Sequence, residues 1–139
     1  MTFATDFKKL LEEVDSDFDP PLSSSLNLHD YAQKIYHNAS IFSVHEEGKL
    51  VAALAVYSND PNREIAFCTM LAVGKQHRNY GHGTNLVRTT VDFLKKKSFK
   101  FFRLEIYKNN PKAITFYKRL NFAAFSENEH TVFVELKIS

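Results

Sequence analysis

The stretch QHRNYGHGTNLV, residues 76–87, joins an apolar run to an apolar helical pattern. It holds two of the chain's four glycines, Gly81 and Gly83, with Arg78 before them and His82 between them. Glycine permits backbone conformations that strain other residues and lets a ligand approach closely. The first N–H groups of a helix attract anions, and arginine adds a fixed positive charge. The stretch therefore predicts a phosphate site, with a plain strand-to-helix turn as the alternative.

The chain as a whole has the length and composition of one globular domain, which we expect to span residues 1–139. A net charge of +2 argues against a dedicated nucleic-acid binder. The sequence shows neither an apolar run of membrane-spanning length nor a signal-peptide core, so we expect no membrane partner. The lone cysteine, Cys68, fits a reducing compartment. A cytoplasmic protein is the simplest expectation.

The spacing of apolar residues predicts the element order α, α, β, β, β, α, β, α, β, β. Asn27 and Asn110 are expected to cap helices, and Asn121 to end one in the left-handed conformation. Almost continuous apolar character predicts that residues 50–57 and 65–73 are strands buried on both faces, with helices on both sides of the sheet. The helices and strands are expected near 3–14, 28–39, 50–57, 65–73, 86–97, 100–107, 110–120, 122–126 and 131–138, with a further strand at 41–45 and a loop at 15–25.

Two well-known phosphate loops do not match residues 76–87. The dinucleotide fingerprint needs a third glycine where this chain has Leu86, and the P-loop needs a Gly-Lys-Ser/Thr sequence that is absent. The pattern that does match is Arg-x-x-Gly-x-Gly, directly after the apolar residues MLAV. It resembles the acyl-CoA pyrophosphate loop of the GCN5-related N-acetyltransferase (GNAT) superfamily.

A second motif supports the same resemblance. The stretch LEIYKNNPKAITFYKRLNF, residues 104–122, is similar to the superfamily's other signature, a strand followed by Asn-x-x-Ala and a tyrosine on a helix. These residues are Asn110, Ala113 and Tyr117. The resemblance covers about residues 50–122 and implies an α/β (α+β) fold with a mixed, mostly antiparallel, splayed sheet flanked by helices. Members usually open with a strand, but none is evident before Phe3.

The resemblance implies that acetyl-CoA is the co-substrate. In the superfamily, backbone groups just before the loop bind the pantetheine arm, and here these belong to Leu71, Ala72 and Val73. Asn110 would lie near the pantetheine end, in addition to capping its helix. The resemblance places the pyrophosphate at the loop and the helix start, which comprise Arg78, Asn79, Tyr80, Gly81, His82, Gly83 and Thr84.

The same resemblance implies direct attack of an amine on the thioester within a ternary complex. Tyr117 would protonate the departing thiolate; the alternative is a purely structural aromatic residue in the core. An ammonium group cannot attack, so a base or a water chain must first remove a proton. Glu105 is the first candidate, because ribosomal-protein N-terminal acetyltransferases have a glutamate base at the matching place. Glu64, His45 and bound water are the other candidates.

No metal site is predicted. His77 and His82 alone do not make one, and the aspartates of DSDFD, residues 15–19, lack the glycine and glutamate of a calcium loop. The expected acceptor is a small-molecule amine, an amino sugar or a protein N-terminus, and the expected assembly is a monomer or homodimer. The alternative functions are a non-catalytic acyl-CoA-binding or regulatory module with the same fold and, less favoured, a phosphate-binding interaction domain.

Overall fold

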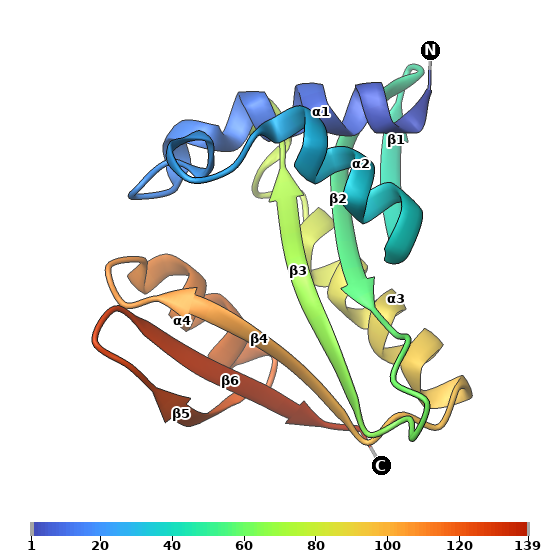
Figure 1. Ribbon diagram of the computed structural model, residues 1–139, viewed down its shortest axis with the longest axis vertical. Helices are drawn as coiled ribbons and strands as arrows, with labels where there is room; N and C mark the ends of the chain where they lie inside the picture. Colours follow the sequence, from blue (N-terminus) through green and yellow to red (C-terminus); the bar gives the residue numbers. More distant parts are fainter. Residues whose placement is uncertain (1, 139) are drawn as a thin grey trace.

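The computed structural model describes residues 2–138, which form one mixed sheet with helices on both of its faces (Figure 1). The strand order is β1-β2-β3-β4-β6-β5, and only the β3–β4 pair is parallel. The mixed, mostly antiparallel sheet is therefore confirmed. The elements are α1 (Phe3–Val14), α2 (Leu28–Asn38), β1 (Ser40–Glu46), β2 (Lys49–Tyr57), β3 (Ile65–Val73), α3 (His82–Lys96), β4 (Phe101–Tyr107), α4 (Pro111–Arg119), β5 (Ala123–Glu127) and β6 (Thr131–Lys137), with short 3-10 turns at Asp15–Asp17, Leu22–Ser24 and Lys75–His77.

The ends of the helices follow from local sequence. The side chain of Asn27 accepts a hydrogen bond from the Asp30 N–H at 3.0 Å, and that of Asn110 accepts one from the Ala113 N–H at 3.2 Å. Asn121 has a positive φ of 73°, as expected of a residue that ends a helix in the left-handed conformation. Within residues 2–138, α1 is the first element, so no strand precedes it.

Strand β2 is buried on both faces, as predicted. On one face, Ala53 and Ala55 pack in an apolar cluster with residues of α1 and α2. On the other face, Leu54 and Val56 pack in a second apolar cluster, to which α3 and α4 contribute. Figure 1 shows α1 and α2 in front of the β1–β3 half of the sheet and α3 behind it. No helix within residues 2–138 has the length and apolar composition needed to cross a bilayer.

Strand β3 departs from the prediction. Phe67, Thr69 and Leu71 are only partly buried, because they line an opening in the sheet. The opening arises where β3 and β4 separate: the two strands pair only over residues 65–67 and 101–103. Beyond these residues they diverge, as Figure 1 shows, which confirms the splayed sheet. The edge of β3 is thereby freed for contact with a ligand.

Candidate active site

The connection from β3 to α3 has the backbone conformation and the free N–H groups that an anion site requires. Asn79 and Gly81 have positive φ angles of 69° and 83°, a conformation that glycine adopts without strain and asparagine tolerates. The first main-chain bond of α3 runs from the Asn85 N–H to the Gly81 carbonyl at 3.0 Å. The N–H groups of residues 82–84 come before that bond, so they lie at the positive end of the helix dipole, where an anion binds favourably.

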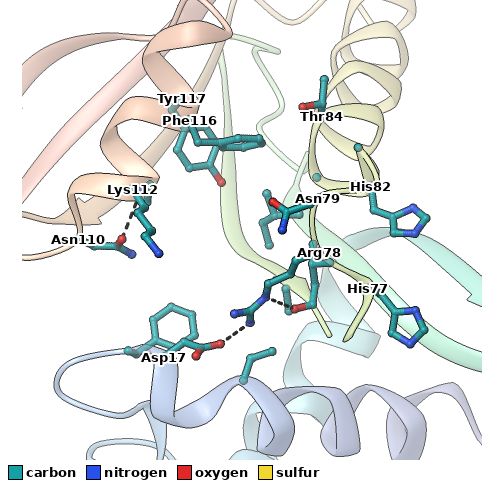
Figure 2. A pocket seen from close by; sticks show the side chains of 18 residues that line it. Asp17, His77, Arg78, Asn79, His82, Thr84, Asn110, Lys112, Phe116 and Tyr117 are labelled. Carbon is teal, nitrogen blue, oxygen red and sulfur yellow. Dashed lines mark hydrogen bonds and ion pairs between the residues drawn. The ribbon is translucent and has the colours of Figure 1, made fainter. Parts of the chain in front are cut away.

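A pocket of about 600 Å³ adjoins this loop (Figure 2). Its walls come from the end of β3, from the loop and from the start of α4. Tyr80 is the exception among the predicted cofactor residues: it is 74% exposed and does not line the pocket. The predicted residues that the pocket brings together are Leu71, Ala72, Val73, Arg78, Asn79, Gly81, His82, Gly83, Thr84, Asn110 and Tyr117.

Arg78 does not reach freely into the pocket. Its guanidinium forms an ion pair with Asp17, and its Nε donates a hydrogen bond to the Val73 carbonyl at 3.1 Å (Figure 2). Asp17 lies in the segment between α1 and α2, so this contact places the 15–25 segment against the pocket. A carboxylate in this position would compete with a phosphate for the same cation. Asp17 could not be chosen from the sequence alone, because three aspartates alternate along an aperiodic loop.

His77 and His82 share one carboxylate at the edge of the site. Nδ1 of His77 lies 2.9 Å from one oxygen of Glu46, and Nε2 of His82 lies 3.3 Å from the other, without the geometry of a hydrogen bond. In Figure 2 both rings point away from Tyr117. They tie the loop to the end of β1. Within residues 2–138, no cluster of His, Cys, Asp and Glu could hold a metal ion.

Tyr117 lies on α4 and is 8% exposed. Its ring contacts those of Phe116 and Phe122 edge-on, with centroid distances of 4.9 Å and 5.4 Å. Burial raises the pKa of its phenol well above the ordinary value of 10.0, with a smaller contribution from Cys68, so the hydroxyl stays protonated at neutral pH. Figure 2 shows this hydroxyl directed into the pocket. Among the described residues it has no hydrogen-bond partner, so it is available to a ligand.

A second pocket, of about 410 Å³, opens between β3 and β4, and Glu105 is part of its lining. Oε2 of Glu105 accepts a hydrogen bond from the Thr131 hydroxyl at 2.7 Å. Tyr117 and Asn110 line both pockets. Glu105 is therefore absent from the first pocket and lines the second together with Tyr117. The N–H groups at the start of α3 and the carboxylate of Glu105 thus belong to two pockets that share one protonated phenol.

Several lining residues were not predicted as part of a site. Phe116 is one of them, and a Cβ built on Gly83 would lie 3.3 Å from its Cζ. The second glycine of the loop therefore lets α3 and α4 approach closely. Lys112, which also lines the first pocket, carried no signal beyond a charge in the first turn of a helix.

The buried thiol of Cys68 is not a nucleophile. It is 7% exposed, and burial raises its pKa to about 12, so almost none of it is thiolate at neutral pH. Its Sγ donates to the Met70 carbonyl at 3.6 Å. Cys68 therefore serves as a small buried hydrophobic residue.

Comparison with solved structures identifies the fold. An acetyltransferase assigned to the GNAT family from Desulfovibrio desulfuricans superposes with a TM-score of 0.83 at 12% identity, covering 98% of this chain and 92% of that one. The ribosomal-protein-S18-alanine N-acetyltransferase of Escherichia coli superposes with a TM-score of 0.78 at 19% identity, covering 100% of this chain and 91% of that one. The PaiA N-acetyltransferase of Thermoplasma acidophilum in complex with coenzyme A superposes with a TM-score of 0.74 at 14% identity, covering 96% of this chain and 94% of that one.

Comparison of sequences identifies the family. A search of the curated proteins finds no match. The model of the acetyltransferase (GNAT) family, however, matches residues 7–122, which include the loop between β3 and α3, Tyr117 and the helix cap Asn110. With the loop, the splayed sheet and this match in agreement, the chain belongs to the acetyltransferase (GNAT) family.

Proposed function

We propose that residues 1–139 form one N-acetyltransferase domain, which transfers the acetyl group of acetyl-CoA to a primary amine by direct attack in a ternary complex. The observation that carries the proposal is the position of Tyr117, whose side chain lines both the pocket beside the anion-binding loop and the pocket containing Glu105. One pocket would hold the acyl donor and the other the amine. The lone cysteine keeps a cytoplasmic location as our expectation.

The residues of the first pocket fit coenzyme A. The N–H groups of residues 82–84 would bind the pyrophosphate, with the positive φ of Asn79 and Gly81 shaping the loop around it. The main chain of residues 71–73 on the freed edge of β3 would bind the pantetheine arm. Asn110, at the start of α4, lies where that arm would end. Acetyl-CoA supplies the thioester whose acetyl group is transferred.

Glu105 and Tyr117 would manage the protons of the transfer. Glu105 takes one proton from the bound ammonium and passes it to solvent, which leaves a free amine able to attack. The new C–N bond forms as the C–S bond breaks, and Tyr117 gives its proton to the leaving thiolate. The second proton lost by the nitrogen restores the phenol, so one proton is released for each acetyl group transferred.

The decisive experiment separates this function from the alternatives. Calorimetry with coenzyme A tests whether the chain binds CoA at all; failure would favour a phosphate-binding interaction domain. Release of free thiol from acetyl-CoA in the presence of an amine panel then tests turnover. CoA binding without amine-dependent thiol release would favour a non-catalytic acyl-CoA-binding module. A small-molecule amine, an amino sugar and a protein N-terminus belong in the panel, and sedimentation distinguishes monomer from homodimer.

Replacement of Gly83 by valine tests the loop. The new side chain would meet Phe116 on one side, since even a Cβ lies 3.3 Å from its Cζ, and would crowd the N–H groups at the helix start. We expect CoA to bind at least tenfold more weakly, about 1.4 kcal/mol, in calorimetry.

The double variant Gly83→Val/Phe116→Leu is the control for that experiment. It makes room for the valine, so a loss caused only by displacement of the ring would be recovered. A loss that persists in the double variant would come from the blocked main chain. Unchanged CoA affinity in a folded Gly83→Val protein would contradict the assignment of the loop.

Replacement of Asp17 by asparagine tests the ion pair at the first pocket. The change removes the carboxylate that competes for Arg78 while keeping the size of the side chain. We expect CoA affinity to rise roughly two- to fivefold, since partly exposed pairs contribute up to about 1 kcal/mol, and the gain should shrink at high ionic strength. Asp19→Asn makes the same charge change outside the pocket lining and should leave affinity unaltered. Weaker binding by Asp17→Asn would show that Asp17 orients Arg78 for the cofactor.

A further inference from the structure

The outer wall of the second pocket is apolar. Phe18, Leu22 and Leu26 line it from the segment between α1 and α2. Leu26 is 38% exposed although it lines the pocket, so an apolar ligand there would cover side-chain surface that now faces water. The opposite wall, formed by β3 and β4, adds further apolar side chains, among them Phe67 and Met70.

Most of the polar side chains that line this pocket already have a hydrogen-bond partner, whereas the Tyr107 and Tyr117 hydroxyls have none among the described residues. The Tyr31 hydroxyl lies 3.2 Å from the Thr69 carbonyl and 3.0 Å from its hydroxyl. The Thr131 hydroxyl donates to Glu105, and the Asn110 side-chain oxygen accepts the cap bond of α4. A ligand rich in hydroxyl groups would bury polar atoms here against mainly apolar side chains, which is unfavourable.

Glu105 supplies the charge of the pocket. Among the described residues that line it, Glu105 alone carries a charge, and no Lys, Arg or His contributes. A carboxylate in this position attracts an ammonium group and repels a ligand that has a carboxylate beside its amine. The walls therefore select for one positive charge on an otherwise apolar molecule.

We propose that the acceptor is a primary monoamine on a compact apolar group, with arylalkyl amines as the representative class. This inference rests on the proposed function, because it takes the second pocket as the amine's side of Tyr117. The volume of about 410 Å³ is within the range of small-molecule sites. An amino sugar fits less well, since its several hydroxyl groups would face mainly apolar side chains. A peptide N-terminus, whose main chain could bond to the freed edge of β3, is the competing acceptor in the test.

A set of four acceptors tests the class. Phenethylamine represents it, and phenylalanine is its matched control, because it differs only by a carboxylate beside the amine. Glucosamine and a heptapeptide with a free N-terminal leucine represent the other acceptors. Binding is measured by calorimetry on the CoA-loaded protein, and transfer by thiol release from acetyl-CoA. We expect kcat/KM for phenethylamine to exceed each of the other three by roughly tenfold or more.

The variant Leu26→Asn locates the binding. It should raise the KM for phenethylamine roughly tenfold and leave the Kd of CoA unchanged, because Leu26 lines only the second pocket. Tyr36→Asn is the matched control: Tyr36 is 49% exposed on α2 and lines neither pocket. It should change neither constant, and melting curves verify that both variants are folded.

The outcomes separate this inference from the proposed function. Preferred acetylation of glucosamine, phenylalanine or the peptide would overturn the inference while supporting N-acetyl transfer. Phenethylamine that binds to the CoA-loaded protein and loses affinity with Leu26→Asn, while none of the four amines is acetylated, would support the ligand class and overturn the enzymatic function. Absence of both binding and transfer of phenethylamine would overturn the inference whatever the other amines do.

Discussion

Tyr117→Phe is expected to lower the single-turnover rate of acetyl transfer by roughly 10²-fold, the lower range for loss of a general acid. The phenol is protonated at neutral pH because burial raises its pKa, and the removed hydroxyl points into the pocket. Phenylalanine keeps the ring contacts with Phe116 and Phe122, so folding and CoA affinity should change little. Rapid-quench measurement of acetylated amine, with melting temperature and CoA calorimetry on the same sample, checks all three expectations.

The opposite result has a clear meaning. A folded Tyr117→Phe protein with an unchanged chemical rate would defeat the role of the phenol as proton donor, although it would leave the family membership intact. Tyr36→Phe removes an exposed hydroxyl outside both pockets and should leave the rate unaltered. Because the pKa of Tyr117 is raised, the wild-type rate should also show no loss from ionisation of this phenol as the pH rises to about 10.

Glu105→Gln should reduce kcat/KM at neutral pH by a similar factor, roughly 10²-fold. Glutamine cannot take the proton from the ammonium group, nor attract its charge, but its amide oxygen can still accept the bond from Thr131. The deficit should shrink as the pH approaches the pKa of the amine, near 10.4 for an alkyl ammonium such as lysine, because solution then supplies the free base. A pH profile of kcat/KM for the two proteins measures this convergence.

Thr131→Val separates the chemistry of Glu105 from a structural role. It removes the hydroxyl that donates to the carboxylate at 2.7 Å and retains both the carboxylate and the volume of the buried side chain. If Glu105 acts as the base, this variant should keep most of its activity. If it instead serves only to hold β4 against β6, both variants should lose stability together, and Glu105→Gln should keep its rate per folded molecule at every pH.

Much of the architecture could be predicted because it depends on local sequence. Apolar spacing indicates the helices and strands, and Asn27, Asn110 and Asn121 indicate helix ends without reference to any tertiary contact. The loop could be predicted for the same reason, since the positive φ at 79 and 81 and the close approach at 83 favour asparagine or glycine. Each of these features is determined by residues that lie only a few positions apart in the sequence.

Features that depend on distant segments could not be predicted. The pairing of Arg78 with Asp17 joins residues 61 positions apart, and nothing in the repeated aspartates of the loop favours Asp17 over its neighbours. The carboxylate of Glu46 beside two loop histidines has the same origin. The partial exposure of β3 was also missed, because an apolar run does not disclose that its neighbouring strand turns away after three residues.

The two pockets differ in the groups that a ligand would contact: mainly main-chain groups in the first and mainly side chains in the second. Beside the loop between β3 and α3, the groups suited to the proposed cofactor are main-chain amides and carbonyls, which persist under most substitutions. The second pocket instead takes its outer wall from the side chains of Phe18, Leu22 and Leu26, in a segment without long helix or strand. Substitutions in that segment could therefore change which ligand the second pocket accepts while leaving the main-chain groups of the first pocket in place.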